Sequence, residues 1–247
     1  MLTVFPFYEG DVDEMLDLME WIHELGGCAG HDALLVPDFG TNSRNIMDVV
    51  RLADKSFSNV ELITNGENVI GWIEGPKSLF LAASKYAHEN KVPFLQMETD
   101  AIPLHANWLD DIALHYEGLD RRYLGHIYES KTPGFPERCL SGIAVYPYQV
   151  WEYRQAIREG RNWDLTLSNF VIPQSVNTPL IHHFWGMKDL PPTFRDRSIA
   201  KPINAFTLED IPKEAVIWHR NKDGTLIKLL RKRFHATIGD LCQSSKT

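Results

Sequence analysis

The chain has 247 residues, of which 44% are hydrophobic, 23% charged and 11% aromatic. This composition is typical of a globular protein and excludes a disordered, collagen-like or coiled-coil chain. The formal net charge of −8 argues against a protein that coats nucleic acid by general charge attraction. No apolar run approaches the roughly 18 residues of a membrane-spanning helix, and residues 1–7 lack the basic start of a signal peptide. We therefore expect a soluble, cytoplasmic protein.

Hydrophobic periodicity predicts alternating strands and helices along the first half of the chain. Strands are expected at residues 3–8, 33–36, 60–64 and 92–98, and helices at residues 11–25, 44–53 and 76–90. Such alternation is typical of an α/β domain with a mainly parallel sheet. The length fits one domain, because hydrophobic cores stop growing near roughly 250 to 300 residues.

The second half of the chain is less regular. We expect a helix at residues 108–116, strands at 123–128, 143–146 and 180–184, and a proline-containing loop at 191–202. Long loops in compact domains are often functional lids. Residues 226–234 predict a short basic amphipathic helix, with Leu226, Leu229 and Leu230 on one side.

The segment from Phe94 to Leu109 carries the most informative chemistry. Its first four residues predict a strand that delivers Glu98 and Asp100 at its carboxyl end, and Pro103 is expected to stop this strand. Ligands bind outside this edge of open α/β sheets. Two carboxylates separated by one residue can hold Mg²⁺ or Mn²⁺, because hard divalent cations prefer oxygen ligands. The alternative is an exposed turn rich in acids.

The run ETDAIPL…WLD resembles the DxD-type motif of GT-A glycosyltransferases, which binds a metal together with a nucleotide-sugar diphosphate. It is similar in particular to glycosyltransferases of tailed phages. Three more segments fit the resemblance in the correct order: GWIEGPKSLFLAA as the helix at the sugar donor, LSGIAVYP as a glycine-bearing strand, and VIWHRNKDGTLIKLL as a late segment with a metal-binding histidine and a phosphate-facing lysine.

The resemblance covers most of residues 3–230 and implies a single GT-A domain over residues 1–247. Within it, residues 1–104 would form the nucleotide-sugar-binding half and residues 105–219 the acceptor half. Residues 220–247 would form a basic C-terminal segment.

The resemblance assigns the metal site to three side chains. Asp100 would be the principal ligand, His219 would complete the metal shell, and Glu98 would contact the ribose or a metal-bound water. His183 is the rival to His219; because side chains alternate along a strand, only one of His182 and His183 can reach the site. For either candidate, a histidine of the core is the alternative.

Asp164 is the candidate catalytic residue. It stands where the resemblance places an acidic residue at the start of a helix, ahead of the acceptor pocket. In an inverting enzyme, this carboxylate takes the proton of the acceptor hydroxyl. The alternative is that Asp164 only caps the helix.

The donor nucleotide and its phosphates are assigned to a further group of residues. Tyr8 and Glu9 end the first strand, where the first βα turn meets the ligand. The other donor candidates are Asn65, Trp72, Lys77, Gly142 and Lys222. Trp163 and Trp185 would suit an acceptor surface, because aromatic faces pack against sugars and bases.

The sequence therefore predicts a metal-dependent glycosyltransferase that uses Mn²⁺ or Mg²⁺ and a nucleotide diphosphate sugar, with UDP as the expected nucleotide. The resemblance to phage proteins implies a hydroxymethylated pyrimidine in DNA as acceptor, with Arg231, Lys232 and Arg233 contacting phosphates. Three alternatives stay open: an enzyme that acts on a glycan or lipid at a membrane, with the helix leucines toward lipid; a nucleotidyltransferase; and a non-catalytic binding module.

Overall fold

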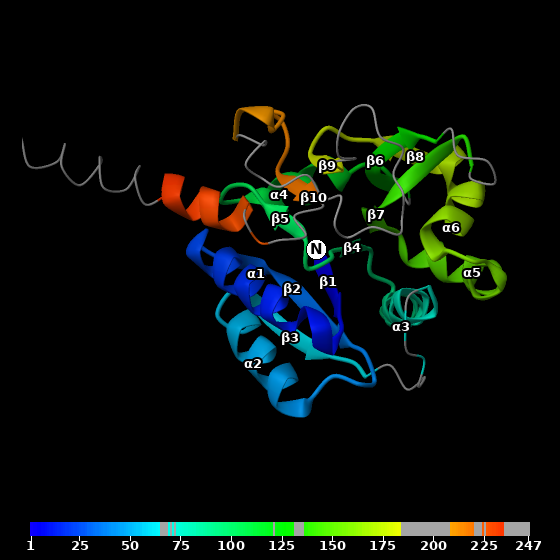
Figure 1. Cartoon of the computed structure of the whole chain (residues 1–247). Coiled ribbons are helices and arrows are strands. Elements are labelled where there is room, and N and C mark those ends of the chain that lie inside the picture. Colours follow the sequence, from blue (N-terminus) through cyan, green and yellow to red (C-terminus); the bar gives the residue numbers. More distant parts are fainter. Residues whose placement is uncertain are drawn as a thin grey trace, which may run out of the picture.

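A seven-stranded sheet with the strand order β3-β2-β1-β4-β7-β6-β8 runs through the molecule (Figure 1). Its strands are β1 (Leu2–Phe7), β2 (Cys28–Pro37), β3 (Phe57–Leu62), β4 (Phe94–Gln96), β6 (Tyr123–Glu129), β7 (Arg138–Tyr146) and β8 (Ser175–Asn177). Only β7 runs antiparallel to its neighbours, and the other four pairings are parallel. The computed structural model describes residues 1–64, 69, 71, 73–120, 122–130, 136–183, 208–219, 224 and 226–234. The predicted α/β fold with a mainly parallel sheet is confirmed.

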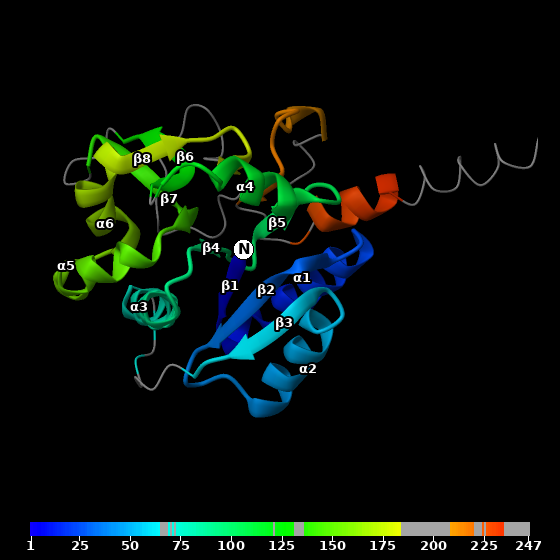
Figure 2. The ribbon, with the colours of Figure 1, turned by 180° about the vertical axis from the view of Figure 1, so that it is seen from behind.

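Helices cover both faces of this sheet. They are α1 (Val12–Glu24), α2 (Ser43–Ala53), α3 (Glu74–Asn90), α4 (Trp108–Tyr116), α5 (Arg154–Glu159), α6 (Trp163–Val171) and the helix of residues 226–234. Short 3-10 turns lie at Glu9–Asp11, Tyr148–Tyr153, Ile172–Gln174 and Leu208–Asp210. Seen from behind, β3 and β2 lie in front of α1 and α2 (Figure 2).

Two hydrophobic clusters hold these layers together. β1 contributes Phe5 and Phe7 to one cluster and Leu2 and Val4 to the other, because successive side chains of a strand point to opposite faces. The first cluster is completed by α1, α2, α4 and the helix of residues 226–234, and the second by α3, α5 and α6. Since β1, β2 and β4 are parallel, their carboxyl ends lie at one edge of the sheet.

A second, three-stranded sheet has the order β5-β10-β9, with β5 at Ala101–Pro103, β9 at Ile181–His183 and β10 at Ile217–His219. β4 ends at Gln96, so the strand does not continue through Pro103, as predicted; the separate short strand β5, which contains Pro103, was not expected. The chain turns after β4 and pairs again, with Pro103 opposite Ile217. Proline is tolerated there because β5 is an edge strand of the small sheet.

Most predicted elements are present, but several ends differ. α4 has the predicted bounds, whereas β2 and β7 each begin five residues before the predicted start. β3 lies at Phe57–Leu62 and not at residues 60–64. The loop predicted at residues 191–202 lies outside the described residues.

The predicted basic amphipathic helix is confirmed, but the contacts made by its apolar and basic side chains differ from those expected. Leu226 and Leu230 are buried in the hydrophobic cluster that contains α1, so they are not presented to lipid. The Nε of Arg231 donates to both carboxylate oxygens of Glu24, at 2.9 and 3.0 Å, and its Nη1 donates to Asp17. Arg231 is thus bound to carboxylates within the protein, which leaves it less available for the phosphate contact that the sequence predicts.

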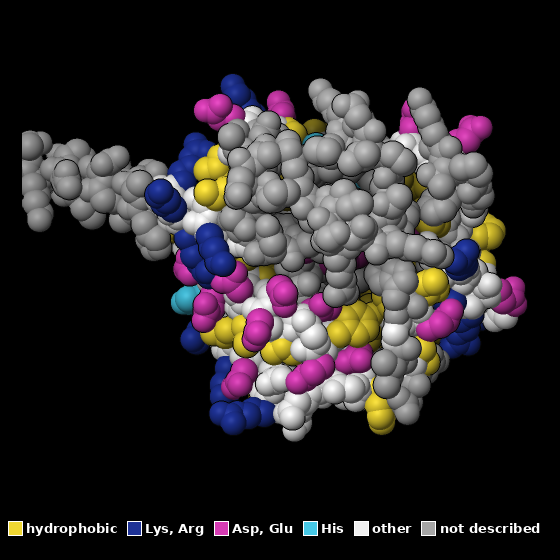
Figure 3. Space-filling model, viewed as in Figure 1, with side chains coloured by type: hydrophobic (Ala, Val, Ile, Leu, Met, Phe, Trp, Pro, Cys, Tyr) yellow, Lys and Arg dark blue, Asp and Glu magenta, His cyan; other side chains and the backbone are white. Residues whose placement is uncertain are grey.

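This bond joins oppositely charged parts of the chain. Residues 1–43 contain nine acidic residues and no Lys or Arg, whereas the helix of residues 226–234 is basic. Figure 3 shows Asp and Glu side chains over α1 and α2, with Lys and Arg side chains beside the C-terminal helix.

Replacing Arg231 by Met should lower the free energy of unfolding by about 1 to 3 kcal/mol, because Asp17 and Glu24 lose charge-assisted hydrogen bonds at a partly buried position. Urea unfolding measures this loss. Lys232→Met is the matched control; its side chain is exposed, and the change should stay within about 0.5 kcal/mol. Equal losses in the two variants would contradict the role given to Arg231.

Candidate functional site

A tight turn at the carboxyl end of β4 presents the two acidic side chains of the ETD motif. The backbone N–H of Ala101 donates to the carbonyl of Glu98 at 3.0 Å, which closes the turn before β5 begins. Asp100 is buried and Glu98 is partly exposed. The strand end therefore carries the carboxylates as the sequence predicts.

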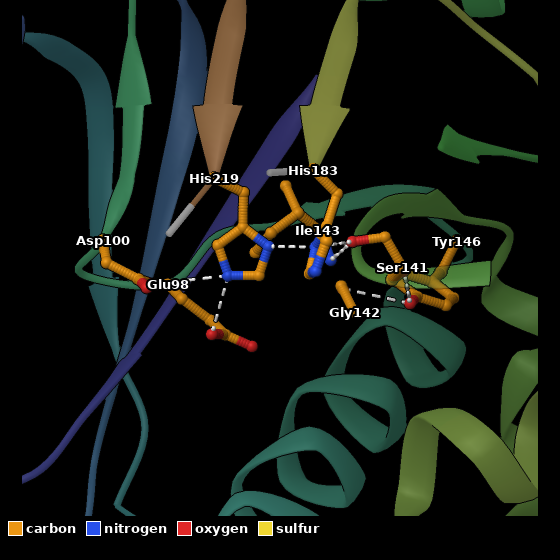
Figure 4. Close-up of polar contacts among 8 residues, drawn as sticks. All are labelled: Glu98, Asp100, Ser141, Gly142, Ile143, Tyr146, His183 and His219. Carbon is orange, nitrogen blue, oxygen red and sulfur yellow. Dashed lines mark hydrogen bonds and ion pairs between the residues drawn. The ribbon is translucent and has the colours of Figure 1, made fainter. Parts of the chain in front are cut away.

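The small sheet brings the distant histidines to this turn. On β10, His219 is opposite Ala101 of β5, the residue that follows Asp100, and it is in register with His183 of β9. Residues in register on neighbouring strands share one face. Three separate parts of the chain therefore meet at the same corner (Figure 4).

The geometry of this cluster fits a divalent cation. His219 Nε2 lies 3.2 Å from Glu98 Oε2 and 3.3 Å from Asp100 Oδ1, and one ligand atom from each residue lies within 4.8 Å of the others. Adjacent ligand atoms of an octahedral ion with bonds of about 2.1 Å are separated by roughly 3 Å. Carboxylate oxygens suit Mn²⁺ or Mg²⁺, and the imidazole nitrogen favours the transition metal Mn²⁺ over Mg²⁺. These residues could hold such an ion with little rearrangement.

In the absence of a metal, the two carboxylates favour a charged His219. Burial alone would lower the pKa of His219, but the charges and hydrogen bonds of Asp100 and Glu98 outweigh it and raise the pKa to about 9. A proton on His219 therefore balances the buried negative charge of the site at neutral pH.

This ion pair makes the stability of the metal-free protein depend on pH. The pKa of His219 is about 9 in the folded protein against an ordinary 6.5, so its contribution is complete below pH 6.5 and is lost as the pH rises through 9. We expect the free energy of unfolding, measured with urea in EDTA, to fall between pH 6.5 and 9.5. The fall should be smaller in His219→Gln, and parallel curves for the two proteins would refute this assignment.

Gly142 on β7 makes room for Glu98. A Cβ at this position would lie 3.3 Å from Glu98 Oε1 and 3.4 Å from the Trp163 ring, which is tighter than most such contacts. The hydroxyl of Tyr146 donates to the Gly142 carbonyl at 3.1 Å and holds this part of β7. The structure therefore places Gly142 beside the carboxylates, whereas its role toward the donor stays a prediction.

Asp164 lies in the first turn of α6, within electrostatic reach of the cluster. Burial, with a further contribution from the charge of Glu98, raises the pKa of Asp164 to about 6. The hydrogen bond from the Leu165 N–H and the charge of His219 lower this pKa but do not outweigh the burial. Ser168 links α6 to β7, because its hydroxyl donates to the Asp164 carbonyl and accepts from the Leu140 N–H. A carboxyl group with a pKa near neutrality suits proton transfer.

Asp164 is not the N-cap residue of α6, but one of its oxygens does bond to the start of the helix. The N-cap position of α6 is Asn162, and Asp164 is the second helical residue. Its Oδ1 accepts from the adjacent Leu165 N–H at 2.8 Å. One carboxylate oxygen of Asp164 thus bonds to a backbone N–H at the start of α6. The role of Asp164 in catalysis stays a prediction.

Tyr8 follows β1 and lies within electrostatic reach of Glu98. Burial, and then the charge of Glu98, raises the pKa of Tyr8 well above its ordinary value. Its ring packs against the backbone of Gly75 at the start of α3. Glu9 instead accepts from the Asn42 N–H and the Asn45 side chain, at 2.8 and 2.7 Å, so it holds the start of α2.

Lys77 bonds to residues of α3 and α5. Its buried ammonium donates to Glu74 at 2.8 Å and to the Arg158 carbonyl at 3.2 Å, between α3 and α5. It lines a pocket of about 240 Å³ together with Ser78 and Leu81. Among the described residues it makes no hydrogen bond or ion pair with Glu98, Asp100 or His219, and donor binding by Lys77 stays a prediction.

Trp163 is a core residue and not part of an acceptor surface. It is only 7% exposed, and its ring stacks on Phe80 with centroids 3.9 Å apart. The expectation of a sugar-packing face is therefore wrong for this residue. The other expected site residues, Asn65, Trp72, Trp185 and Lys222, lie outside the described residues.

Sequence reasoning missed Ser141, which lies 3.1 Å from His183 Nδ1. It is one residue before the glycine of the LSGIAVYP segment, and a buried serine beside a site glycine carries no pattern of its own. His183 was expected as a rival metal ligand or as a histidine of the core, and the structure places it, buried, in contact with His219.

The mixed sheet flanked by helices matches the GT-A fold of solved glycosyltransferases. Among solved structures, the chain is similar to the galactosyltransferase LgtC in complex with donor and acceptor sugar analogues, with a TM-score of 0.55, 12% identity, and coverage of 91% of this chain and 88% of LgtC. An active-site mutant of LgtC matches with a TM-score of 0.56 and 10% identity, over 94% of this chain and 96% of the mutant.

The bifunctional glycosyltransferase WbbM, in its apo form, is similar with a TM-score of 0.56 and 14% identity. The match covers 90% of this chain and 46% of WbbM, so the chain corresponds to about half of that protein. No protein-family model and no curated protein matches the sequence. At these identities the likeness establishes the GT-A fold, and the finer resemblance to phage proteins stays a prediction.

Within the described part of the chain, no helix is long and apolar enough to cross a membrane.

Proposed function

We propose that this protein is a metal-dependent glycosyltransferase that moves a sugar from a nucleotide diphosphate sugar to an acceptor hydroxyl. The observation that carries the proposal is the convergence of Glu98, Asp100 and His219 at the carboxyl end of β4. This convergence occurs in a fold shared with LgtC and WbbM, both glycosyltransferases. Ligands of open α/β sheets bind at this edge.

Asp100 and His219 would hold Mn²⁺ or Mg²⁺ together, and Glu98 would complete the shell directly or through a water. When bound, such an ion neutralises the charge that develops on the leaving diphosphate. Lys222 would add a second positive charge to the phosphates. Tyr8, at the end of β1 beside Glu98, would face the nucleotide, for which we propose UDP.

Asp164 would act on the other substrate. Its carboxylate would accept the proton of the acceptor hydroxyl as the oxygen attacks the anomeric carbon. The raised pKa of about 6 supports this role, because a base with that value is ionised at neutral pH and still has useful proton affinity. This assignment requires inversion at the anomeric carbon.

Product analysis with a panel of nucleotide sugars tests the reaction class. We expect slow release of a nucleoside diphosphate by hydrolysis without an acceptor, dependent on Mn²⁺ and abolished by EDTA. A nucleotidyltransferase would instead release pyrophosphate from a nucleoside triphosphate. Turnover that is unchanged in EDTA, or absent with every donor, would refute the proposal.

For the acceptor we propose a hydroxymethylated pyrimidine in DNA, on the strength of the sequence resemblance. Lys232 and Arg233 have exposed side chains beside the bound Arg231, so they could contribute two phosphate contacts where the sequence alone predicted three. Enzymatic digestion of treated hydroxymethylated DNA, followed by mass spectrometry of the nucleosides, tests the idea. No added sugar mass with any donor that the enzyme hydrolyses would exclude this acceptor.

A further inference from the structure

His183 lies behind His219, on the side away from the carboxylates. The Nδ1 atoms of the two rings are 2.7 Å apart, while His219 Nε2 faces Glu98 and Asp100 (Figure 4). The rings are nearly perpendicular, at 75°. A line of contacts therefore runs from β7 through His183 to the candidate metal ligand.

A nitrogen pair at 2.7 Å must share one proton, since two lone pairs or two N–H groups would repel each other. If the proton is on His219 Nδ1, then His219 Nε2 presents its lone pair to the carboxylate side, where a metal would bind. If the proton is on His183 Nδ1, neutral His219 carries its own proton on Nε2 and cannot bind a metal there. The tautomer of His183 therefore decides whether His219 is a competent ligand.

Ser141 is compatible with the first arrangement. Its Oγ accepts from the Ile143 N–H at 3.4 Å and lies 3.1 Å from His183 Nδ1, so its hydroxyl can act as a second, longer donor to this nitrogen beside His219 at 2.7 Å. In this arrangement the proton of neutral His183 is on Nε2.

The His183 ring is also held in its plane by stacking. The ring of Tyr128 lies 5.8 Å away at 19°, and the ring of His126 lies 6.4 Å away at 23°. The in-register pairing of β9 and β10 fixes the distance between the two histidines at the backbone. A ring confined in this way keeps its acceptor aimed at His219.

We propose that His183 is a positioning residue for the metal site. It accepts the Nδ1–H of His219 and thereby fixes the tautomer and the orientation in which His219 Nε2 can bind a divalent cation. Outer partners of this kind commonly change metal affinity by 10- to 100-fold. The inference rests on the proposed function, because it needs a metal at Glu98, Asp100 and His219.

Direct Mn²⁺ binding to the full chain, measured by titration calorimetry, tests the proposal without relying on turnover. His183→Phe keeps a ring but removes the acceptor, and we expect its Mn²⁺ affinity to fall by about 10- to 100-fold. His183→Asn retains an acceptor near the position of Nδ1 and should lie within a few-fold of wild type. His182→Phe, on the opposite face of β9, is the matched control and should bind as wild type does.

Nuclear magnetic resonance of wild-type protein with ¹⁵N-labelled histidine and Mg²⁺ supplies a second readout, which remains valid even if a variant fails to fold. We expect His219 with a protonated Nδ1 and a bare Nε2, and His183 with a protonated Nε2. The reverse tautomers would overturn the proposal, as would wild-type Mn²⁺ affinity in His183→Phe. Mn²⁺ binding that survives His219→Asn but is lost in His183→Asn would identify His183 as the ligand and also overturn it.

Wild-type protein and His183→Phe together distinguish a wrong function from a wrong role of His183. If wild-type protein binds no Mn²⁺ and transfers no sugar, then both the proposed function and the role of His183 are wrong. If wild-type protein binds Mn²⁺ and transfers sugar but His183→Phe is indistinguishable from it in affinity, only the role of His183 is wrong.

Discussion

Asp100→Asn should reduce sugar transfer by on the order of 10³-fold and remove the stabilisation of the protein by Mn²⁺ with UDP. The substitution keeps the shape of a buried side chain but removes a charged oxygen ligand that faces His219 at 3.3 Å. Loss of one charge-stabilising group in an active site commonly costs 10² to 10³ in rate, and a metal ligand should lie at the upper end. Steady-state rates and thermal melting with and without Mn²⁺ and UDP measure the two effects.

Asp111→Asn is the matched control for this experiment, because that carboxylate lies on α4 with about half of its side chain exposed. It should leave rate and metal-dependent melting unchanged. Wild-type protein at a ligand concentration 100 times the dissociation constant should gain ~2.7 kcal/mol of stability, and Asp100→Asn should gain little. Retained metal-dependent stabilisation in Asp100→Asn would remove this residue from the metal site.

Asp164→Asn should lower turnover by about 10²- to 10⁴-fold, with donor affinity nearly unchanged. Its ionised form is the proposed base, so the wild-type rate should rise with pH through the pKa of about 6 and then level off. That acid limb should be absent from the residual activity of the variant. Rate measurements from pH 5 to 8 at saturating donor provide the test, with the exposed Glu159→Gln on α5 as control.

The same substitution should make the protein more stable at neutral pH. The pKa of Asp164 rises from 3.8 to about 6 on folding, so stability falls as the pH rises from 3.8 through 6 and stays reduced above that range. A neutral Asn avoids this cost, and Asp164→Asn should melt at a higher temperature than wild type at pH 7.5. A lower melting temperature together with collapsed donor binding would show that Asp164 has a structural role.

The regular part of the fold was accessible from sequence because periodicity reports burial. The stripe of Met15, Leu18 and Ile22 is buried against the sheet as its helical spacing predicts, and α4 has its predicted bounds. The three-residue strands β5 and β10 could not be predicted, because such short segments have no period and owe their conformation to each other.

In the candidate site, too, the residues with a local sequence pattern could be predicted and those brought together by strand pairing could not. Glu98 and Asp100 could be located from a buried strand that ends in acids, but His219 is 121 residues away from Glu98 and was connected to it only through a family resemblance. For Trp163 the sequence led to a wrong prediction of an acceptor surface. The sequence around an aromatic residue does not indicate whether its ring faces a sugar or packs on Phe80. The contact between His183 and His219 depends on strand register, which no local pattern contains.

The attachment of the C-terminal helix to α1 has a consequence for how the protein is made. Arg231 reaches partners 207 and 214 residues earlier in the chain, and Phe234 packs edge-on against Trp21. At about 5 to 20 residues per second, a ribosome needs roughly 10 to 40 s between the synthesis of α1 and that of its last partner. During this interval the side of α1 that packs against the C-terminal helix lacks this part of its apolar cover, so the nascent chain exposes apolar surface there. A chain truncated before residue 226 would retain Asp100, Asp164 and His219 and would still remain in this aggregation-prone state.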